Sequence, residues 1–290
     1  MFKKSNMFIK LYCILLLYSD FCDARLIDQS KQDDEGKIID LLSSINFNNM
    51  ENIKSESRRS YGNDGDDYDD SSQWKGRWFP GDSKMTMGVH ENCDDGKTNL
   101  QVDWDNSPEN YTCFERAIEP NDSEEKIYCE YIPKLYYDAH LCMNETIEYD
   151  DLIPVYGNHR PVWPVYGEYK FIPRERWLHS IEHGAVVMLY HPCAHPKLID
   201  QLKSLVKNCL RRYIITPYNL VDVDRPFVLV TRGCRMEMTQ IVPEIVEAFI
   251  RVTGLHGPED IPEDGGFDEG LIEKAPPRFD ESVSTLCSKS

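Results

Sequence analysis

Eight cysteines between residues 93 and 287 constrain the fold of this 290-residue chain more than any other feature. In an oxidising compartment an even set of this kind indicates a framework of disulfide bonds, with about a hundred ways of pairing them. One pair is disfavoured, because a helix expected between Cys193 and Cys209 would hold them about 20 Å apart, beyond the roughly 7 Å that a bridge spans. The candidates are Cys93, Cys113, Cys129, Cys142, Cys193, Cys209, Cys234 and Cys287.

The N-terminus has the three-part layout of a secretory signal. Three lysines precede the apolar run 11–18, and a short polar segment ends at Asp23-Ala24. We expect cleavage after Ala24, which also removes the remaining cysteines, Cys13 and Cys22. The apolar run is too short for a membrane anchor, which needs roughly 20 residues. We therefore predict a secreted protein; the alternative is a protein that stays membrane-associated in the secretory pathway.

Three glycosylation sequons support the same compartment. They begin at Asn110, Asn121 and Asn144, all within the cysteine-bearing part of the chain. A single sequon is common by chance, so the weight comes from three of them following a signal peptide. We predict a glycoprotein.

The net charge of −18 limits the partners. Nucleic acids and anionic membrane surfaces would be repelled over the whole approach path. No later apolar run is long enough to span a bilayer. We expect no nucleic acid and no membrane span after signal cleavage, and a partner that is a protein or a small ligand.

Shifts in composition divide the chain into five parts. The part after the signal is polar and acidic, which is typical of disorder, and the chain becomes acidic and rich in proline and glycine again near its end. Between these lie a region of aromatics, cysteines and sequons without helical periodicity, and a more regular region. The predicted parts are a signal (1–24), a disordered leader (25–73), a disulfide-stapled region of short strands and loops (74–150), an α+β domain (151–258) and an acidic, disordered tail (259–290).

The regular region alternates buried strands with amphipathic helices. Apolar runs predict strands at 185–190, 212–216 and 226–231, and apolar residues at helical spacing predict helices at 196–210 and 242–253. The order is strand, helix, strand, strand, helix. This order predicts an α+β fold in which helices pack on a small sheet.

Histidines concentrate in the stretch 157–193, and two of them lie on a predicted helix. Pro173 and Gly184 frame that helix, because proline suits its first position and glycine the position just past its end. His179 and His183 are one turn apart, with Glu182 close to both. Two imidazoles at this spacing can chelate one zinc or copper ion.

We predict a metal or ligand site here, in a protein that acts by binding. His159, in the preceding loop, is the candidate third imidazole beside His179 and His183, and His191 or His195 the fourth. In the alternative interpretation the histidines are structural: His179 and Glu182 hydrogen-bond, and His183 occupies a helix C-terminus, where a cation is favoured. The supporting residues are Arg160, Trp163, Glu182, Gly184 and His191.

The same letters fit a second function. His179, Glu182 and His183 match the H-x-x-E-H motif of inverted zinc peptidases, which would make the histidines ligands and Glu182 the general base. Those enzymes place the motif within a long helix, whereas Gly184 ends this one at once. A zinc-dependent hydrolase is therefore the alternative, and a non-enzymatic role is preferred.

These residues also carry a resemblance to a known family. The runs GNHRPVWPVYGEY and RWLHSIEHGAVVMLYHPC resemble the animal family of the p53-inducible tumour protein thirteen and, more distantly, an uncharacterised bacterial domain with an H-x-x-E-H-G signature. The likeness extends roughly over residues 142–258. It implies a role in growth restraint and no established chemistry. The vertebrate pattern includes a C-terminal membrane span, whereas this tail is acidic. The matching positions are His159, Pro161, Trp163, His179, Glu182, His183 and Gly184.

Overall fold

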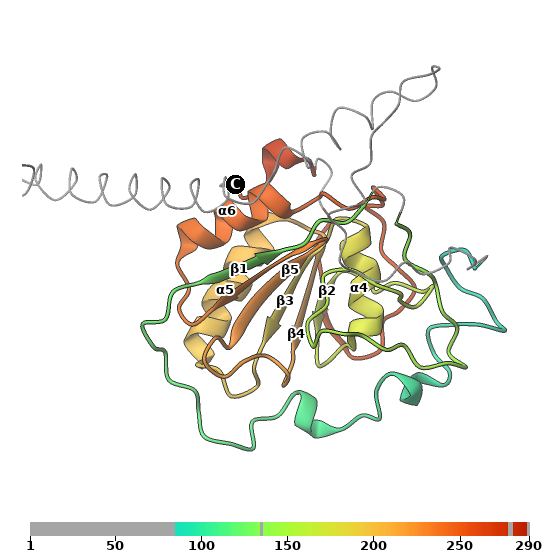
Figure 1. Cartoon of the computed structure of the whole chain (residues 1–290), viewed down its shortest axis with the longest axis horizontal. Coiled ribbons are helices and arrows are strands. Elements are labelled where there is room, and N and C mark those ends of the chain that lie inside the picture. The colour runs from blue at the N-terminus through green and yellow to red at the C-terminus, as the bar shows by residue number, and fades with distance from the viewer. Residues whose placement is uncertain (1–84, 134–135, 278–280, 289–290) are drawn as a thin grey trace, which may run out of the picture. The chain divides into compact units, whose positions relative to one another are not determined.

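The predicted α+β fold is confirmed in a computed structural model, which describes residues 85–133, 136–277 and 281–288. The predicted signal and leader lie outside the described residues. One seven-stranded sheet dominates the described part, with three α-helices beside it (Figure 1). The helices are α4 (Arg174–Glu182), α5 (Pro196–Cys209) and α6 (Pro243–Thr253). The strands are β1 (Lys126–Cys129), β2 (Gly167–Tyr169), β3 (Val186–Tyr190), β4 (Tyr213–Pro217), β5 (Phe227–Thr231), β6 (Cys234–Met238) and β7 (Leu271–Lys274).

The sheet is mixed, in the order β1-β6-β5-β3-β4-β2-β7. Its centre is β3, which pairs in parallel with β4 across the α5 connection and antiparallel with β5. All five residues of β4 and of β5 are buried, as are four of the five in β3. Continuous burial explains why these three strands are uninterrupted apolar runs, and their observed bounds lie within one residue of the predicted ones.

The sequence did not locate the other four strands individually, for a shared physical reason. Strand β6 alternates buried Cys234, Met236 and Met238 with half-buried Arg235 and Glu237, so its apolar content is too low to stand out. Strands β1, β2 and β7 have only three or four residues each. Such strands are defined by their pairing partners rather than by their own composition.

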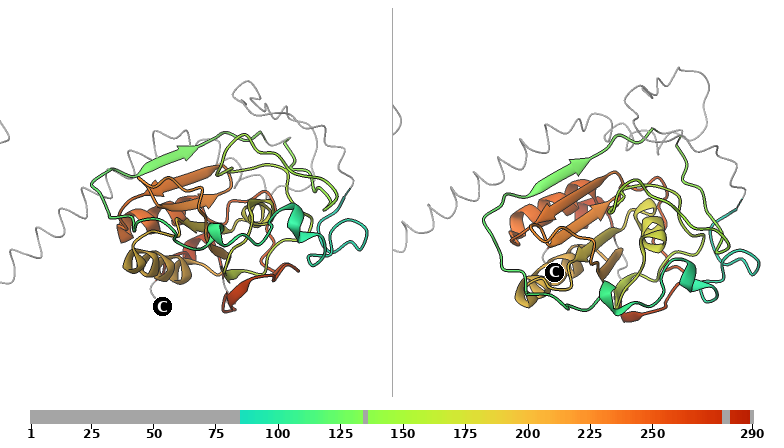
Figure 2. Two further views of the ribbon diagram at one scale, coloured as in Figure 1. Left: turned by 90° about the horizontal axis from the view of Figure 1, so that it is seen from below. Right: turned by 60° about the horizontal axis from the view of Figure 1, so that its bottom comes forward.

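The helices differ in how much of their surface they bury. Helices α5 and α6 pack against each other and bury one face each, as amphipathic periodicity predicts. Helix α4 is enclosed, with every residue from Glu175 to Glu182 buried. The N-terminal irregular segments run over it on the side away from the sheet centre (Figure 2). Among the described residues, no helix combines the length and apolarity needed to cross a membrane.

The predicted disulfide framework is confirmed, with the described cysteines joined in four bridges. Cys193 and Cys209 take different partners, as the intervening helix requires. Two bridges and β1 join the predicted cysteine-rich region to the sheet, so the two pack as one unit. The pairs are Cys93–Cys142, Cys113–Cys193, Cys129–Cys234 and Cys209–Cys287.

The prediction of a disordered tail over 259–290 is wrong for its described residues. Strand β7 extends the sheet by pairing antiparallel with β2. Phe267 and Leu286 are buried, and Cys287 is bridged to Cys209 at the end of α5. A few apolar anchors and one covalent bond order a segment whose average composition is acidic.

Candidate metal centre

Helix α4 presents His179 and Glu182 from one turn. Pro173 precedes the helix as its N-cap, one position earlier than predicted, and the helix ends before His183. Gly184 follows with a φ of +82°, and a Cβ there would lie 2.8 Å from the Cα of Leu255. Gly184 is thus required both by its backbone conformation and by the close approach of the loop after α6.

Two further histidines come from irregular segments that lie side by side. His140 and His159 form an isolated parallel β-bridge. The N–H of Leu141 donates to the carbonyl of His159 (2.9 Å), and the N–H of His159 donates to the carbonyl of Ala139 (3.1 Å). Residues opposite each other in such a bridge project to the same side, and the two imidazole centroids lie 5.0 Å apart.

These elements bring four metal-ligating side chains together: His140, His159, His179 and Glu182. Each offers one donor atom, and the four donor atoms all lie within 4.8 Å of one another. The ring of His179 lies 4.8 Å from that of His140 and 4.5 Å from that of His159. His159, His179 and Glu182 are buried, and His140 is half-buried. We refer to this group as the His₃Glu cluster.

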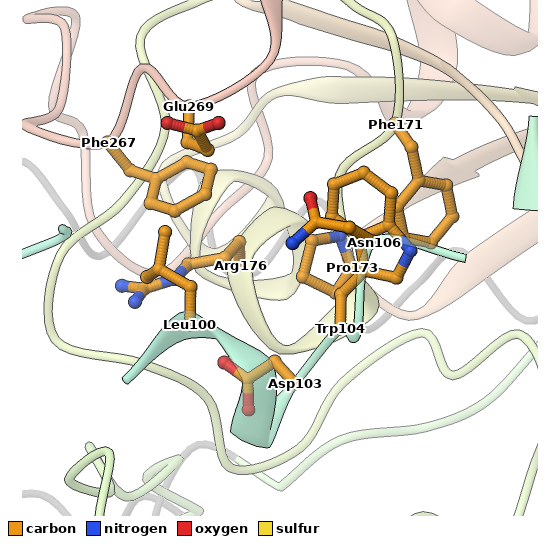
Figure 3. Close-up of a pocket in the computed structure, with 9 residues that line it drawn as sticks. All are labelled: Leu100, Asp103, Trp104, Asn106, Phe171, Pro173, Arg176, Phe267 and Glu269. Carbon is orange, nitrogen blue, oxygen red and sulfur yellow. The ribbon is translucent and has the colours of Figure 1, made fainter. Parts of the chain in front are cut away.

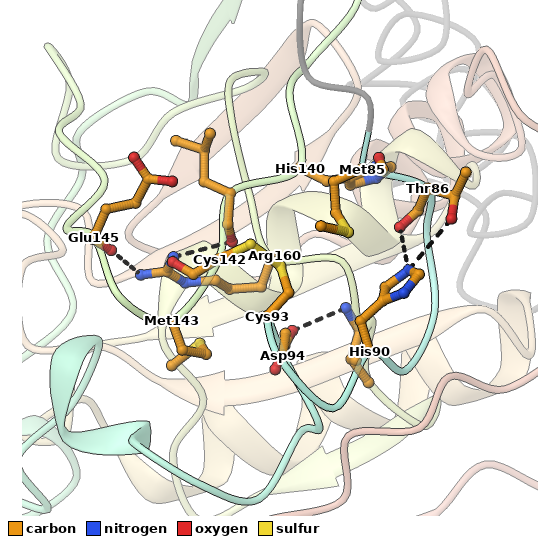
Figure 4. The surroundings of a disulfide bond; sticks show 12 residues. Met85, Thr86, His90, Cys93, Asp94, His140, Cys142, Met143, Glu145 and Arg160 are labelled. Carbon is orange, nitrogen blue, oxygen red and sulfur yellow. Dashed lines mark hydrogen bonds between the residues drawn. A yellow bond between two sulfur atoms is a disulfide. The ribbon is translucent and has the colours of Figure 1, made fainter.

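Backbone carbonyls fix the tautomer of all three imidazoles in the cluster. Nδ1 of His140 donates to the carbonyl of Met85 at 3.1 Å (Figure 4). Nδ1 of His159 donates to the carbonyl of Gly157 at 2.9 Å, and Nδ1 of His179 donates to the carbonyl of Arg160 at 2.6 Å. A carbonyl oxygen only accepts, so each Nδ1 carries a hydrogen, and Nε2 is the atom that can bind a metal ion once the imidazole is neutral. Histidine ligands of metal ions are oriented in this way.

The interior of the cluster contains polar atoms that the protein does not satisfy. Nε2 of His159 lies 3.0 Å from Oε2 of Glu182, without the alignment of a hydrogen bond. Within the described part of the chain, Nε2 of His179 has no hydrogen-bond partner, although its side chain is fully buried. An unsatisfied buried nitrogen costs roughly 1–3 kcal/mol, a cost that a bound ion or a water molecule would offset.

Burial and mutual charge shift the pKa values inside the cluster. Burial, reinforced by His159, lowers the pKa of His140 and holds the pKa of His179 well below its ordinary value, so both are neutral. Burial alone would lower the pKa of His159, but the Glu182 carboxylate outweighs it and raises that pKa. Burial would raise the pKa of Glu182, but His159 outweighs it and brings that pKa to about 2.

A buried ion pair anchors the segment that carries His140. Arg232, in the turn between β5 and β6, binds the carboxylate of Asp138, and the side chains of both are almost fully buried. Asp138 lies two residues before His140. The pair therefore fixes an irregular segment on the rigid end of a hairpin, close enough for Arg232 to interact electrostatically with Glu182.

The structure places two other predicted residues beside the cluster. The ring of His183 lies 4.6 Å from that of His179, but its Nε2 faces Oε2 of Glu259 at 3.2 Å. Trp163 packs against both rings, at 5.3 Å from His179 and 5.0 Å from His183. His183, predicted as a ligand, therefore lies beside the four donors and not among them.

Two predicted histidines lie far from the cluster. His191 follows β3, whose five residues span about 17 Å, while α4 ends before that strand begins. Nδ1 of His191 accepts from the N–H of Cys193 at 3.1 Å. His195 precedes α5 as its N-cap. The strand does not turn back, so neither residue can supply the fourth ligand.

His140 is the member of the His₃Glu cluster that the sequence did not reveal. It lies outside the histidine-rich stretch, two residues before Cys142, in a segment without helical or strand periodicity. Only its pairing with the backbone of His159 brings it to the cluster. No signal in the sequence of a single chain predicts a pairing of that kind.

A separate hollow lies at the other end of α4 (Figure 3). It encloses about 400 Å³, counting its open mouth, and its walls are largely apolar. Its two most buried charges are neutralised: Arg176 binds Asp94, and Asp103 binds Arg160. The lining residues are Leu100, Asp103, Trp104, Asn106, Phe171, Pro173, Arg176, Phe267 and Glu269.

Comparison with known proteins yields one family match. Residues 140–266 match a family described as protein of unknown function (DUF3105). The matched range is less than half of the 290-residue chain, and it contains all four donors of the His₃Glu cluster. No curated protein matches the chain, and no solved structure matches it. The family has no assigned chemistry, so the function has to be argued from the site.

Proposed function

We propose that this chain is an extracellular, disulfide-bonded protein that binds one transition-metal ion, zinc foremost, at His140, His159, His179 and Glu182. One observation carries the proposal: three imidazoles, each held at Nδ1 by a backbone carbonyl, share a donor group with one buried carboxylate. Four bridges among the described cysteines are consistent with an oxidising compartment.

The donor set favours a transition metal such as zinc or copper over calcium and magnesium. Imidazole nitrogen suits zinc, copper, iron and nickel, whereas calcium and magnesium require mostly oxygen ligands. Sulfur does not compete, because all described cysteines are in bridges. Zinc binds imidazole nitrogen and carboxylate oxygen at about 2.0–2.2 Å in a tetrahedron, and modest movements bring four atoms within 4.8 Å of one another onto such a site.

Four protein donors around one buried centre are typical of a structural metal site. Catalytic zinc sites keep one position open for water, whereas structural sites are closed by protein ligands. The ion would join α4 to the segments of His140 and His159, and so fasten the disulfide-stapled region onto the sheet domain. We infer a binding protein whose fold the metal stabilises; a role in growth restraint follows only from the family resemblance.

Metal analysis of the full chain, secreted from a eukaryotic host and purified without chelators, tests the proposal. We expect about one zinc per chain, strongly reduced in His179→Ala and unchanged in His191→Ala, a matched substitution outside the cluster. A wild-type protein with only trace zinc and copper would overturn the proposal. Retention of the metal by His179→Ala would overturn it as well.

Glu182→Gln separates this function from the hydrolase alternative. If Glu182 is a ligand, the neutral amide weakens metal binding. If Glu182 is the general base of a hydrolase, the variant keeps its metal and loses hydrolysis of peptide or ester substrates. The position of Glu182 within the donor group supports the first outcome.

A further inference from the structure

The three predicted glycosylation sequons lie in different environments. Asn144 is exposed, in the turn that follows Cys142, between Met143 and Glu145. Thr146, the third residue of its sequon, is also exposed. A transferase and a bulky oligosaccharide would both have access here.

The turn that contains Asn144 is also held in place by contacts with the rest of the fold. Arg160 donates to the carbonyl of Glu145 at 2.8 Å, and Cys142 is bridged to Cys93. Ile147, just beyond the sequon, is buried. These contacts keep the peptide fixed while the Asn144 side chain points to solvent, so an attached sugar displaces nothing.

Asn110 has the opposite environment. Its Oδ1 accepts from Nε1 of Trp104 at 2.9 Å, and its Nδ2 donates to Oδ1 of Asn219 at 3.1 Å. The indole of Trp104 packs against Phe171, with ring centroids 4.8 Å apart. A sugar on Nδ2 of Asn110 would compete with Asn219 for space and disturb this aromatic contact. Asn121 lies between the two extremes, because its Nδ2 donates to the carbonyl of Asp224 at an exposed position.

We propose that Asn144 carries an N-linked oligosaccharide in the secreted protein and that Asn110 does not. In the transfer, Nδ2 of Asn144 bonds to C1 of the first sugar of a lipid-linked oligosaccharide pyrophosphate. The bond from C1 to the pyrophosphate oxygen breaks, Nδ2 loses one proton, and the lipid pyrophosphate leaves. Transfer occurs before folding is complete, so the fold acts as a filter: chains modified at Asn110 cannot form the native contacts of Trp104 and Asn219.

The proposal rests on the extracellular part of the proposed function and not on the metal. The test is a peptide map of the full chain secreted from a eukaryotic host, after release of glycans by peptide N-glycosidase in H₂¹⁸O, which marks each formerly glycosylated asparagine by mass. We expect the mark on most copies of Asn144 and on almost none of Asn110. Asn144→Gln should remove one glycan from the intact mass, whereas Asn110→Gln should leave the mass of the glycans unchanged.

Secreted protein with an unmarked Asn144, or with a marked Asn110, would overturn the proposal while leaving the extracellular assignment in place. The map of the wild-type chain decides this even if a variant fails to fold. A chain retained in the cytosol with reduced cysteines would overturn both the glycan proposal and the extracellular assignment. The zinc content of the same preparation separately tests the metal.

Discussion

The carbonyl oxygen of Arg160 accepts a hydrogen bond from Nδ1 of His179 over 2.6 Å, which joins the loop after His159 to the middle of α4. The guanidinium of the same residue binds Asp103 and donates to the carbonyl of Leu141 at 3.0 Å, next to His140. Arg160 therefore contacts or adjoins all three histidines of the cluster without being able to bind a cation itself.

This position makes Arg160 a positioning residue for the metal. Arg160→Lys keeps the charge but loses the planar fork that reaches Asp103 and the Leu141 carbonyl together. We expect a zinc affinity about 10- to 100-fold weaker, the usual cost of losing an outer contact of a metal site. Competition with a chelator of known affinity measures it. The control is Arg211→Lys, at the half-buried ion pair with Asp264, which should leave the zinc affinity unchanged. Equal zinc affinities in the two variants would contradict a positioning role for Arg160.

The Arg232–Asp138 pair gives a prediction about stability. Arg232→Met leaves the Asp138 carboxylate buried and uncompensated, so we expect the free energy of unfolding to fall by about 3–5 kcal/mol. Adding Asp138→Asn removes that stranded charge and should restore a large part of the loss. Urea unfolding of the wild type, both single variants and the double variant measures the coupling. A double variant that is no more stable than Arg232→Met would show that the stranded Asp138 charge does not cause the loss of stability.

Gly184 can be tested against another glycine of similar backbone conformation. Gly184 and Gly88 both have positive φ, +82° and +103°, but an added Cβ meets Leu255 only at Gly184 and nothing within 4 Å at Gly88. We expect Gly88→Ala to cost about 1–2 kcal/mol for the backbone conformation alone, and Gly184→Ala clearly more because the loop after α6 must move. Thermal unfolding compares the two. Equal costs would mean that the contact with Leu255 is unimportant.

Glu175 gives a prediction about pH. Burial, aided by the nearby Asp103, raises the pKa of its carboxyl from 4.5 to about 7, despite the contact with Arg174 at 3.6 Å. Between these two pH values the folded protein keeps a proton that the unfolded chain has lost. Stability contributed by Glu175 therefore falls as the pH rises from 4.5 to about 7, by no more than about 3 kcal/mol.

Glu175→Gln removes this proton and should flatten that part of the pH profile. Urea unfolding of both proteins at intervals between pH 4.5 and 7.5 measures the difference. The variant should gain most over the wild type at the upper end of the range. A wild-type profile that rises steadily over this range and is unchanged by the substitution would rule the prediction out.

Local patterns predicted the central strands of the sheet and the three helices. Continuous apolar runs predict β3, β4 and β5, and helical periodicity predicts α5 and α6. Pro173 and Gly184 mark the two ends of α4. None of these predictions depends on which segments pack against the element. The edge strands and the ordered tail depend on pairing between segments far apart in the sequence, as β7 with β2, which no local pattern encodes.

The site divides in the same way. Helical spacing predicts that His179 and Glu182 lie close together, and His159 was expected near them from the preceding loop. The structure has all three in the His₃Glu cluster. The same spacing suggested His183, but the helix ends at that residue, and its side chain turns to Glu259. His140 lies in the cluster because of a single β-bridge to His159, so it could be identified only from the three-dimensional structure.

Comparing variants of His140 and His183 tests the proposed set of zinc ligands most directly. The measurement is the zinc content per folded chain in His140→Gln and His183→Gln, purified side by side, with circular dichroism confirming the fold of each. We predict that His140→Gln loses most of its zinc and that His183→Gln retains about one equivalent. Loss of zinc in His183→Gln together with full retention in His140→Gln would contradict the assignment and favour the ligands of the H-x-x-E-H motif.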